Sequence, residues 1–220
     1  MTAGVQPRIE AHAFARPVID LFAPGGLDWE QAAETSVRLS PTPVDAQPSA
    51  YVRALAASRV YGTLEVVEVS AATSGGAFYV RLRWQAANPQ RAITDNDVFA
   101  DACAVMFPLA GGDAPLATMG SPEHPVQAWH WRAGTEVPFV VNATGLGTST
   151  RLPHHAVTAA AEWARDRWSV VFRRPLDGAG VPLQPHVTLP VAFAVWQGCN
   201  AERAGLASRT PAWLDLDIAT

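Results

Sequence analysis

The feature that most constrains the fold of this 220-residue chain is an alternation of apolar and polar side chains with a period of two. It is clearest over residues 77–84, where four apolar side chains share one face and Tyr79, Arg81 and Arg83 share the other. A period of two is the repeat of a β-strand, whereas a helix repeats about every 3.6 residues. The same reasoning predicts further strands over residues 60–69, 102–107, 136–142, 168–172 and 187–196.

Gly- and Pro-containing turns separate these segments, as in Ser74-Gly-Gly76. Many short strands joined by such turns predict an all-β fold, and we expect a single antiparallel β-sandwich with a few short helices. Residues 1–27, rich in Pro, Gly and Ala, are expected to form an extended N-terminal arm, and residues 28–220 one sandwich domain.

The composition narrows the classes of function. Charged residues make up 16% of the chain, against about 25% in typical soluble domains. This low charged fraction, together with eight tryptophans, indicates that part of the surface contacts something other than water. A large partner interface or a bound prosthetic group would both fit. A net charge of −4 spread along the chain argues against nucleic-acid binding. No apolar run reaches the roughly 18 residues of a membrane span, and the N-terminus shows neither an apolar signal core nor a twin arginine.

The sequence contains none of the common catalytic signatures. Gly-x-Ser-x-Gly, His-Glu-x-x-His and Gly-rich phosphate loops are absent. Cys103 and Cys199 match no zinc or Cys-x-x-Cys spacing, and the absence of Cys-x-x-Cys-His excludes covalent haem. The two cysteines form either a disulfide or two thiols, and we favour buried thiols. Asp95, Asp97 and Asp101 lack the glycine and distal glutamate of a calcium loop, and are expected to hold the turn before the next strand.

Several short motifs occur in a characteristic order between residues 28 and 218. They are Ala104-Val-Met-Phe-Pro108, Met119-Gly120, Val126 with Trp129 and Trp131, Trp168 to Leu176, Val191 to Gly198, Glu202-Arg203, and Trp213 with Leu214. Each motif is weak by itself. In this order and spacing they resemble the haem b (gamma) subunit of the ethylbenzene dehydrogenase, dimethyl sulfide dehydrogenase, selenate reductase and chlorate reductase family of molybdenum enzymes.

This resemblance implies a fold similar to carbohydrate-binding β-sandwiches, with haem b at one end and a hairpin over residues 156–166. It implies a non-catalytic electron-transfer subunit. Its partners would be a molybdenum-containing alpha subunit, an iron–sulfur beta subunit and an external carrier such as a c-type cytochrome. The implied compartment is the periplasm, with the cytoplasm as the alternative because the N-terminus lacks a signal pattern.

The resemblance also implies an axial iron ligand, Met119, whose thioether is a soft neutral donor. Gly120 beside it allows close approach of the backbone to a flat ring. In the family a lysine near the last tryptophan is the second ligand, but this chain contains no lysine. Counting back from Trp213 places Ser208 there, with Arg209 beside it. Neither replaces an amine, since arginine stays protonated and serine is a poor iron ligand.

Histidine is the usual alternative iron ligand. We rank His154 or His155 first, because both follow Pro153 in a loop and are free to turn inward. His130 is expected on the strand face opposite Trp129. The predicted cofactor-binding set is then Met119, Gly120, Trp129, Ser208 and Arg209, with the Arg209 guanidinium suited to a haem propionate.

Two readings without haem remain open at this stage. In one, the sandwich is a scaffold subunit that lost its cofactor together with the lysine. In the other, it binds glycans through exposed Trp129, Trp131 and Trp163.

Overall fold

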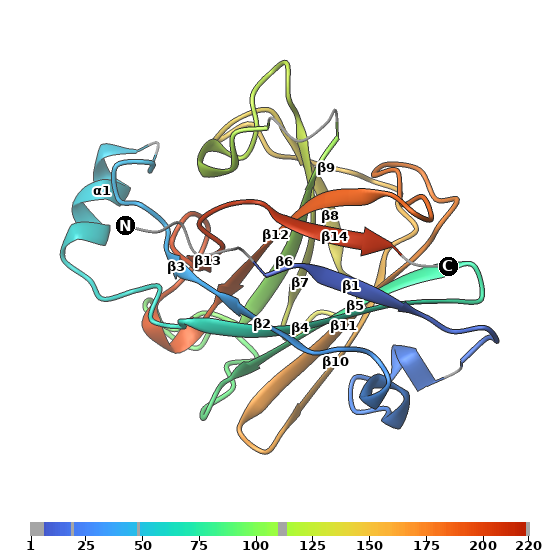
Figure 1. Cartoon of the computed structure of the whole chain (residues 1–220). Coiled ribbons are helices and arrows are strands. Elements are labelled where there is room, and N and C mark those ends of the chain that lie inside the picture. The colour runs from blue at the N-terminus through green and yellow to red at the C-terminus, as the bar shows by residue number, and fades with distance from the viewer. Residues whose placement is uncertain (1–6, 19, 48, 110–113, 219–220) are drawn as a thin grey trace.

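Two facing layers of β-strands make up the computed structural model, which describes residues 7–18, 20–47, 49–109 and 114–218 (Figure 1). One continuous path of paired strands runs through both layers. Residues 1–6 of the expected N-terminal arm lie outside the described residues.

The first layer, sheet A, contains the long hairpins and both ends of the described chain (Figure 1). Its strands, in spatial order, are β10 (Thr158–Ala164), β11 (Arg167–Pro175), β5 (Ala77–Gln85), β4 (Val66–Ser74), β1 (Ile9–Ala13) and β14 (Leu214–Ile218). β2 (Thr35–Arg38) pairs with β4.

The second layer, sheet B, is joined to the first through β12. Its strands are β12 (Thr188–Trp196), β6 (Ala102–Pro108), β7 (Val126–Arg132), β8 (Phe139–Ala143) and β9 (Thr150–Arg151), with β13 (Ser208–Arg209) and β3 (Ser40–Pro41) beyond β12. The first half of β12 pairs with β14 and the second half with β6. The chain therefore folds over at β12, which brings the two sheets face to face.

Helices are short in the described part of the chain. They are α1 (Ala50–Ala57) and the 3-10 helices η1 (Asp20–Phe22), η2 (Leu27–Glu30), η3 (Leu116–Thr118) and η4 (Gly198–Asn200). Of these, η1 and η2 cover the outer side of sheet A, where Leu21 and Trp29 pack against Tyr79 and Val171.

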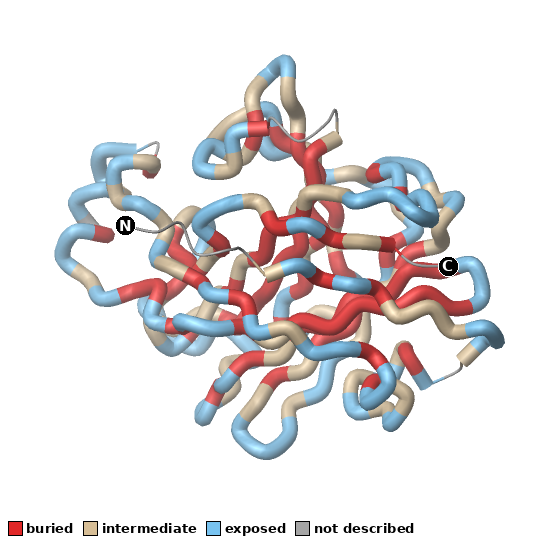
Figure 2. Tube along the Cα trace, in the orientation of Figure 1, coloured by how far each residue is buried: buried red, intermediate tan, exposed pale blue. Residues whose placement is uncertain are grey.

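The core between the sheets is built from the apolar residues of the period-two pattern (Figure 2). Phe78 of β5 lies 6.4 Å from Trp129 of β7, ring centre to ring centre, and Trp84 lies 6.3 Å from Trp131. These contacts join residues that alternate toward the inside of both layers. The layers are thus held together by large aromatic side chains, which remove the most apolar area from water.

The predicted β-sandwich is confirmed, and so is the hairpin over residues 156–166. β10 and β11 pair from Thr158 to Arg173, with a turn at Arg165 and Asp166 in the left-handed region. The pairing is not antiparallel throughout, since β1 runs parallel to both β4 and β14. β1 also falls within the stretch expected to be an arm, and it lies inside the sheet.

Asp101 joins three segments at one end of the sandwich. It is 2% exposed, and its carboxylate accepts hydrogen bonds from the backbone N–H of Gln90 (2.8 Å) and Gly198 (2.8 Å) and from Nε1 of Trp168 (2.9 Å). The expected turn-holding role thus belongs to Asp101. Asp97, by contrast, is exposed and pairs with Arg59.

Candidate functional site

Sheet B has one face packed in the core and one face turned away from it. Cys103, Val105 and Trp129 belong to the core cluster. Their neighbours in the strands point to the opposite side, because successive side chains of a strand alternate. We call this opposite side the outer face of sheet B.

Small side chains dominate the centre of the outer face. We call the residues concerned the alanine floor: Ala104, Ala128, Ala192 and Ala194. Each ends in a single methyl group, and Ala104, Ala128 and Ala192 are buried among their neighbours. Met106 lies among them, directly opposite Ala128 on β7 and Ala192 on β12.

Strand register places the side chains of Arg209 and His130 at opposite ends of a row of paired residues that crosses four strands. Arg209 pairs with Ala194, Ala194 with Ala104, and Ala104 with His130. Three strand spacings of about 4.8 Å separate the two ends, so the Cα atoms lie about 14 Å apart. The alanine floor therefore has Arg209 on one side and His130 on the other.

Met119 lies at a third side of the outer face. It ends η3 with φ 57° and ψ 50°, and its N–H donates to the carbonyl of Leu116 at 3.2 Å. Its partly buried side chain packs against Val126 and Ala143, in a cluster that also holds Met106 and Trp213. The thioether thus reaches the outer face from the loop between β6 and β7.

Gly120 fixes the turn that presents Met119. Its φ is +86°, and a Cβ there would lie 2.8 Å from the carbonyl oxygen of His124 and 3.1 Å from that of Ala143. The first separation is shorter than real Cβ contacts. Only glycine suits both the dihedral angle and the space.

Gly120→Ala is expected to destabilise the chain more than Gly76→Ala. Both glycines have positive φ, which costs roughly 1–2 kcal/mol for other residues, but a Cβ at Gly76 would meet nothing within 4 Å. The difference between the two variants isolates the clash in the Met119 turn. Urea unfolding of both variants measures it, and equal losses of stability would contradict the packing described here.

His130 is partly buried between two aromatic rings. Its ring centre lies 4.3 Å from that of Phe139, nearly parallel to it, and 5.0 Å from that of Trp196. Its Nδ1 is buried and has no hydrogen-bond partner. Burial, with a smaller effect of Arg132, lowers the pKa of His130 to about 4. The imidazole is therefore neutral at pH 7.

Arg209 and Ser208 point in different directions. Ser208 is fully buried, and its hydroxyl accepts a hydrogen bond from the N–H of Leu64 at 3.2 Å. Arg209 is partly buried on the outer face and donates from Nη1 to the carbonyl of Thr210, while its Nε is buried without a partner. Burial lowers the pKa of this guanidinium. Of the two, only Arg209 shares the outer face with the alanine floor and has a buried donor without a partner.

The histidines ranked first from sequence do not gather with Met119. His154 and His155 line a cavity of about 560 Å³ together with Gln127 and Asn142. Gln127 and Asn142 alternate with Val126 and Ala143, which Met119 contacts, so the two histidines lie on the other side of β7 and β8. Trp129, also predicted at the site, is fully buried in the core, where its Nε1 donates to Gln127.

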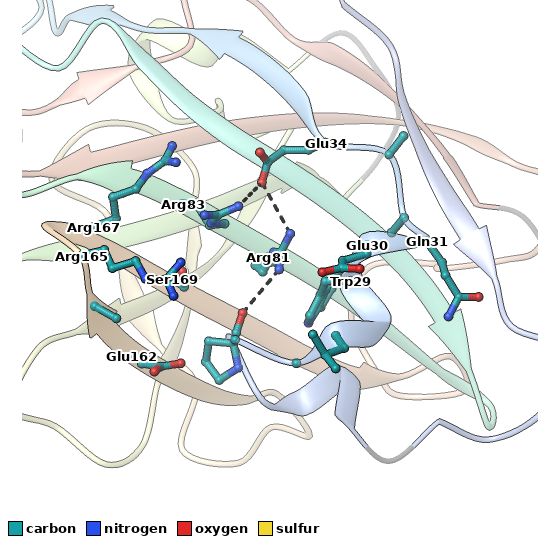
Figure 3. A pocket seen from close by; sticks show the side chains of 17 residues that line it. Trp29, Glu30, Gln31, Glu34, Arg81, Arg83, Glu162, Arg165, Arg167 and Ser169 are labelled. Carbon is teal, nitrogen blue, oxygen red and sulfur yellow. Dashed lines mark hydrogen bonds and ion pairs between the residues drawn. The ribbon is translucent and has the colours of Figure 1, made fainter.

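A second cavity, of about 980 Å³, lies on the far side of the molecule, on sheet A (Figure 3). Its wall includes Arg81 and Arg83, which share the carboxylate of Glu34 at 3.5 and 2.8 Å, and Arg167 on the neighbouring strand β11. Arg81 also stacks over Trp29, 4.7 Å from the ring centre. These arginines hold η2 and the Glu34 segment on sheet A, away from Met119.

Three further expectations can be compared with the described part of the chain. Cys103 and Cys199 are free thiols, as favoured, although only Cys103 is buried. Trp129 and Trp131 are buried and Trp163 is partly buried against the core, so the exposure expected of Trp129 and Trp131 in the glycan-binding reading is wrong. Within the described residues, no three His, Cys, Asp or Glu side chains come together as a metal site, and no helix has the length and hydropathy of a membrane span.

Sequence reasoning correctly placed His130 on the face opposite Trp129, but it missed the alanine floor beside His130. The alanines were available as a signal, since they alternate with core residues in β6, β7 and β12. Their meeting on one face, however, depends on which strands pair and in which register.

The matched family model carries the description ethylbenzene dehydrogenase and spans residues 27–151, more than half of the chain. The chain belongs to the ethylbenzene dehydrogenase family. Within the family's matched segment lie β6, the Met119 loop, β7 and β8, which provide Met119 and His130 but not Arg209.

Individual relatives extend this ethylbenzene dehydrogenase family match. The chain is 34% identical over 203 residues to the chlorate reductase subunit gamma of Ideonella dechloratans, covering 90% of this chain and 80% of the relative. It is 34% identical over 146 residues to a protein of Haloferax mediterranei named as a respiratory nitrate reductase haem subunit, covering 65% of this chain and 52% of that one. The dimethylsulfide dehydrogenase subunit gamma of Rhodovulum sulfidophilum is 34% identical over 156 residues, covering 66% and 58%.

Among solved structures, a Bacteroides uniformis protein described as carbohydrate-binding has a TM-score of 0.55 with this chain. The match covers 97% of this chain and 99% of the other, at 13% sequence identity. At this identity the likeness concerns the fold alone.

Proposed function

We propose that this chain is the haem b-carrying gamma subunit of a heterotrimeric molybdenum oxidoreductase. In this role it passes electrons between the iron–sulfur clusters of a beta subunit and an external carrier such as a c-type cytochrome, while an alpha subunit performs the substrate chemistry. The observation that carries the proposal is the 34% identity over 203 residues to a chlorate reductase gamma subunit. Relatives named as gamma or haem subunits support it further.

The outer face of sheet B fits a haem in three respects. The alanine floor and Met106 offer an apolar surface, Met119 brings a thioether to its edge, and Arg209 has a buried Nε without a partner. An unpaired buried donor is costly, and a propionate would satisfy it by a charge-assisted hydrogen bond. Bound there, the haem iron supplies reversible one-electron transfer. The chain's residues hold the ring and exclude water from it.

Arg209→Gln is expected to weaken haem retention, because glutamine keeps a donor but loses the charge. Outer partners of metal sites typically contribute about 10–100-fold in affinity. The matched control is Arg38→Gln, an exposed arginine on β2 of the other sheet. Haem titration of the haem-free chain followed by absorbance measures both affinities, and equal values would refute the role of Arg209.

A periplasmic location is part of the proposal. It follows from the resemblance to the gamma subunits. Cell fractionation with an antibody against this chain tests it, and recovery in the cytoplasmic fraction alone would contradict it.

The decisive experiment is a reduced-minus-oxidised spectrum with a pyridine haemochrome assay on the native complex. We expect a b-type Soret band and about one haem per chain, together with copurifying molybdenum and iron–sulfur subunits. Copurification of those subunits without a b-type band would favour the scaffold reading instead. A chain that copurifies with neither a molybdenum subunit nor an iron–sulfur subunit would overturn the assignment to such a complex.

A further inference from the structure

We propose that His130 supplies the second axial ligand of the haem iron, on the side of the ring opposite Met119. This inference rests on the proposed function as a haem subunit and adds the residue that takes the place of the missing lysine.

Position is the first argument. Met119 packs on Val126 of β7, and His130 lies four residues further along the same strand. Because this offset is even, the side chains of Val126 and His130 lie on the same face of β7, the outer face of sheet B. His154 and His155 lie on the other side of β7 and β8 and do not share this face.

Space between the two residues is the second argument. Four strand residues at about 3.4 Å each separate Val126 from His130, a span of about 14 Å. Ala128 lies midway, between Met106 of β6 and Val141 of β8, and Ala104 lies directly opposite His130 on β6. The surface between the Met119 loop and His130 is therefore apolar throughout.

The unpaired imidazole is the third argument. Nδ1 of His130 is buried without a partner, while Phe139 stacks on the ring and Trp196 lies tilted against it. A buried polar group without a partner is costly unless something else binds the residue. With a pKa lowered to about 4 the ring is neutral at pH 7, and neutral imidazole has the lone pair that a metal needs.

His124 is the nearest competitor. Its Nδ1 is also buried without a partner. However, it lies in the turn that directly follows Gly120, where its N–H donates to Ser121. Two axial ligands must approach a planar ring from opposite sides, and His124 comes from the same loop as Met119. The geometry therefore favours His130.

The test compares three forms of the haem-loaded full chain: wild type, His130→Ala and His124→Ala. For wild type and His124→Ala we expect a low-spin ferric signal in electron paramagnetic resonance. For His130→Ala we expect retained haem with a high-spin ferric signal, and added imidazole should restore the low-spin signal. Far-UV circular dichroism shows that each variant is folded.

A second measurement does not depend on any variant. Wild-type protein labelled with ¹⁵N-histidine should show, in pulsed electron paramagnetic resonance, hyperfine coupling to one coordinated imidazole nitrogen.

The outcomes separate the two proposals. A b-type band without ¹⁵N coupling, or an unchanged low-spin signal in His130→Ala, overturns the ligand assignment and leaves the haem-subunit role standing. A spin change in His124→Ala alone assigns the ligand to His124. Wild-type protein without a b-type band overturns the proposed function and the ligand assignment together.

Discussion

Met119→Ala is expected to lower the haem midpoint potential and to abolish the sulfur-to-iron charge-transfer absorption. A thioether stabilises ferrous over ferric iron, so its removal shifts the balance toward the ferric form. Haem affinity should also fall, by more than the roughly 10–100-fold typical of losing an outer-shell partner. Redox titration and near-infrared magnetic circular dichroism of the loaded chain measure these effects.

Met106→Ala is the matched control for Met119→Ala. Met106 is a second partly buried methionine packed against the same cluster of Ala114, Val126 and Ala143. Both substitutions remove a thioether from the outer face of sheet B, so the general loss of packing is comparable. The charge-transfer band should persist in Met106→Ala. If it disappears there and persists in Met119→Ala, the methionine ligand has been misassigned.

Asp101→Ala is expected to cause the largest loss of stability among single polar substitutions considered for this chain. The change removes the acceptor of three N–H donors, from Gln90, Gly198 and Trp168. The donors of Gly198 and Trp168 are buried, and each buried donor left without a partner costs about 1–3 kcal/mol. The free energy of unfolding should therefore fall by at least about 2 kcal/mol, which is a large part of the 5–15 kcal/mol typical of folded domains.

Asp97→Ala provides the comparison for Asp101→Ala. Asp97 lies in the same loop, but its side chain is 66% exposed and makes one ion pair with Arg59. Exposed pairs contribute about 0–1 kcal/mol. Urea unfolding followed by tryptophan fluorescence measures both variants. Similar losses for the two would show that the carboxylate of Asp101 does not hold the loops together.

The fold class followed from local pattern because burial in a sandwich depends on which way each side chain points. In β5 the residues Phe78 and Trp84 alternate with Arg81, and every one of them faces the side that its polarity predicts. The local pattern around Arg165 and Asp166 fitted a helix almost as well as a hairpin. The segment before it has helical propensity, and pairing with β11 overrides that preference.

The candidate site was only partly accessible from the sequence. Met119 and Gly120 were identified together, through a motif whose residues are adjacent in the chain. Trp129 was identified from its motif and Ser208 by counting back from Trp213, but both side chains are fully buried. His154 and His155 were chosen because a loop is free to turn inward, and this loop closes a cavity on the other side of β7 and β8.

The sequence by itself determined the two-layer β-sandwich and the family. It also showed that Met119 occupies the position of the family's methionine ligand and that the chain has no lysine to serve as the second ligand. Those properties depend on alternation, motif order and composition, which are local or additive along the chain. Only the tertiary structure decided which residues share the outer face of sheet B. Arg209, Ala194, Ala104 and His130 come from four strands, and hydrogen-bond register alone places them in one row. A shift of one residue in any pairing would turn that strand's side chains to the opposite face.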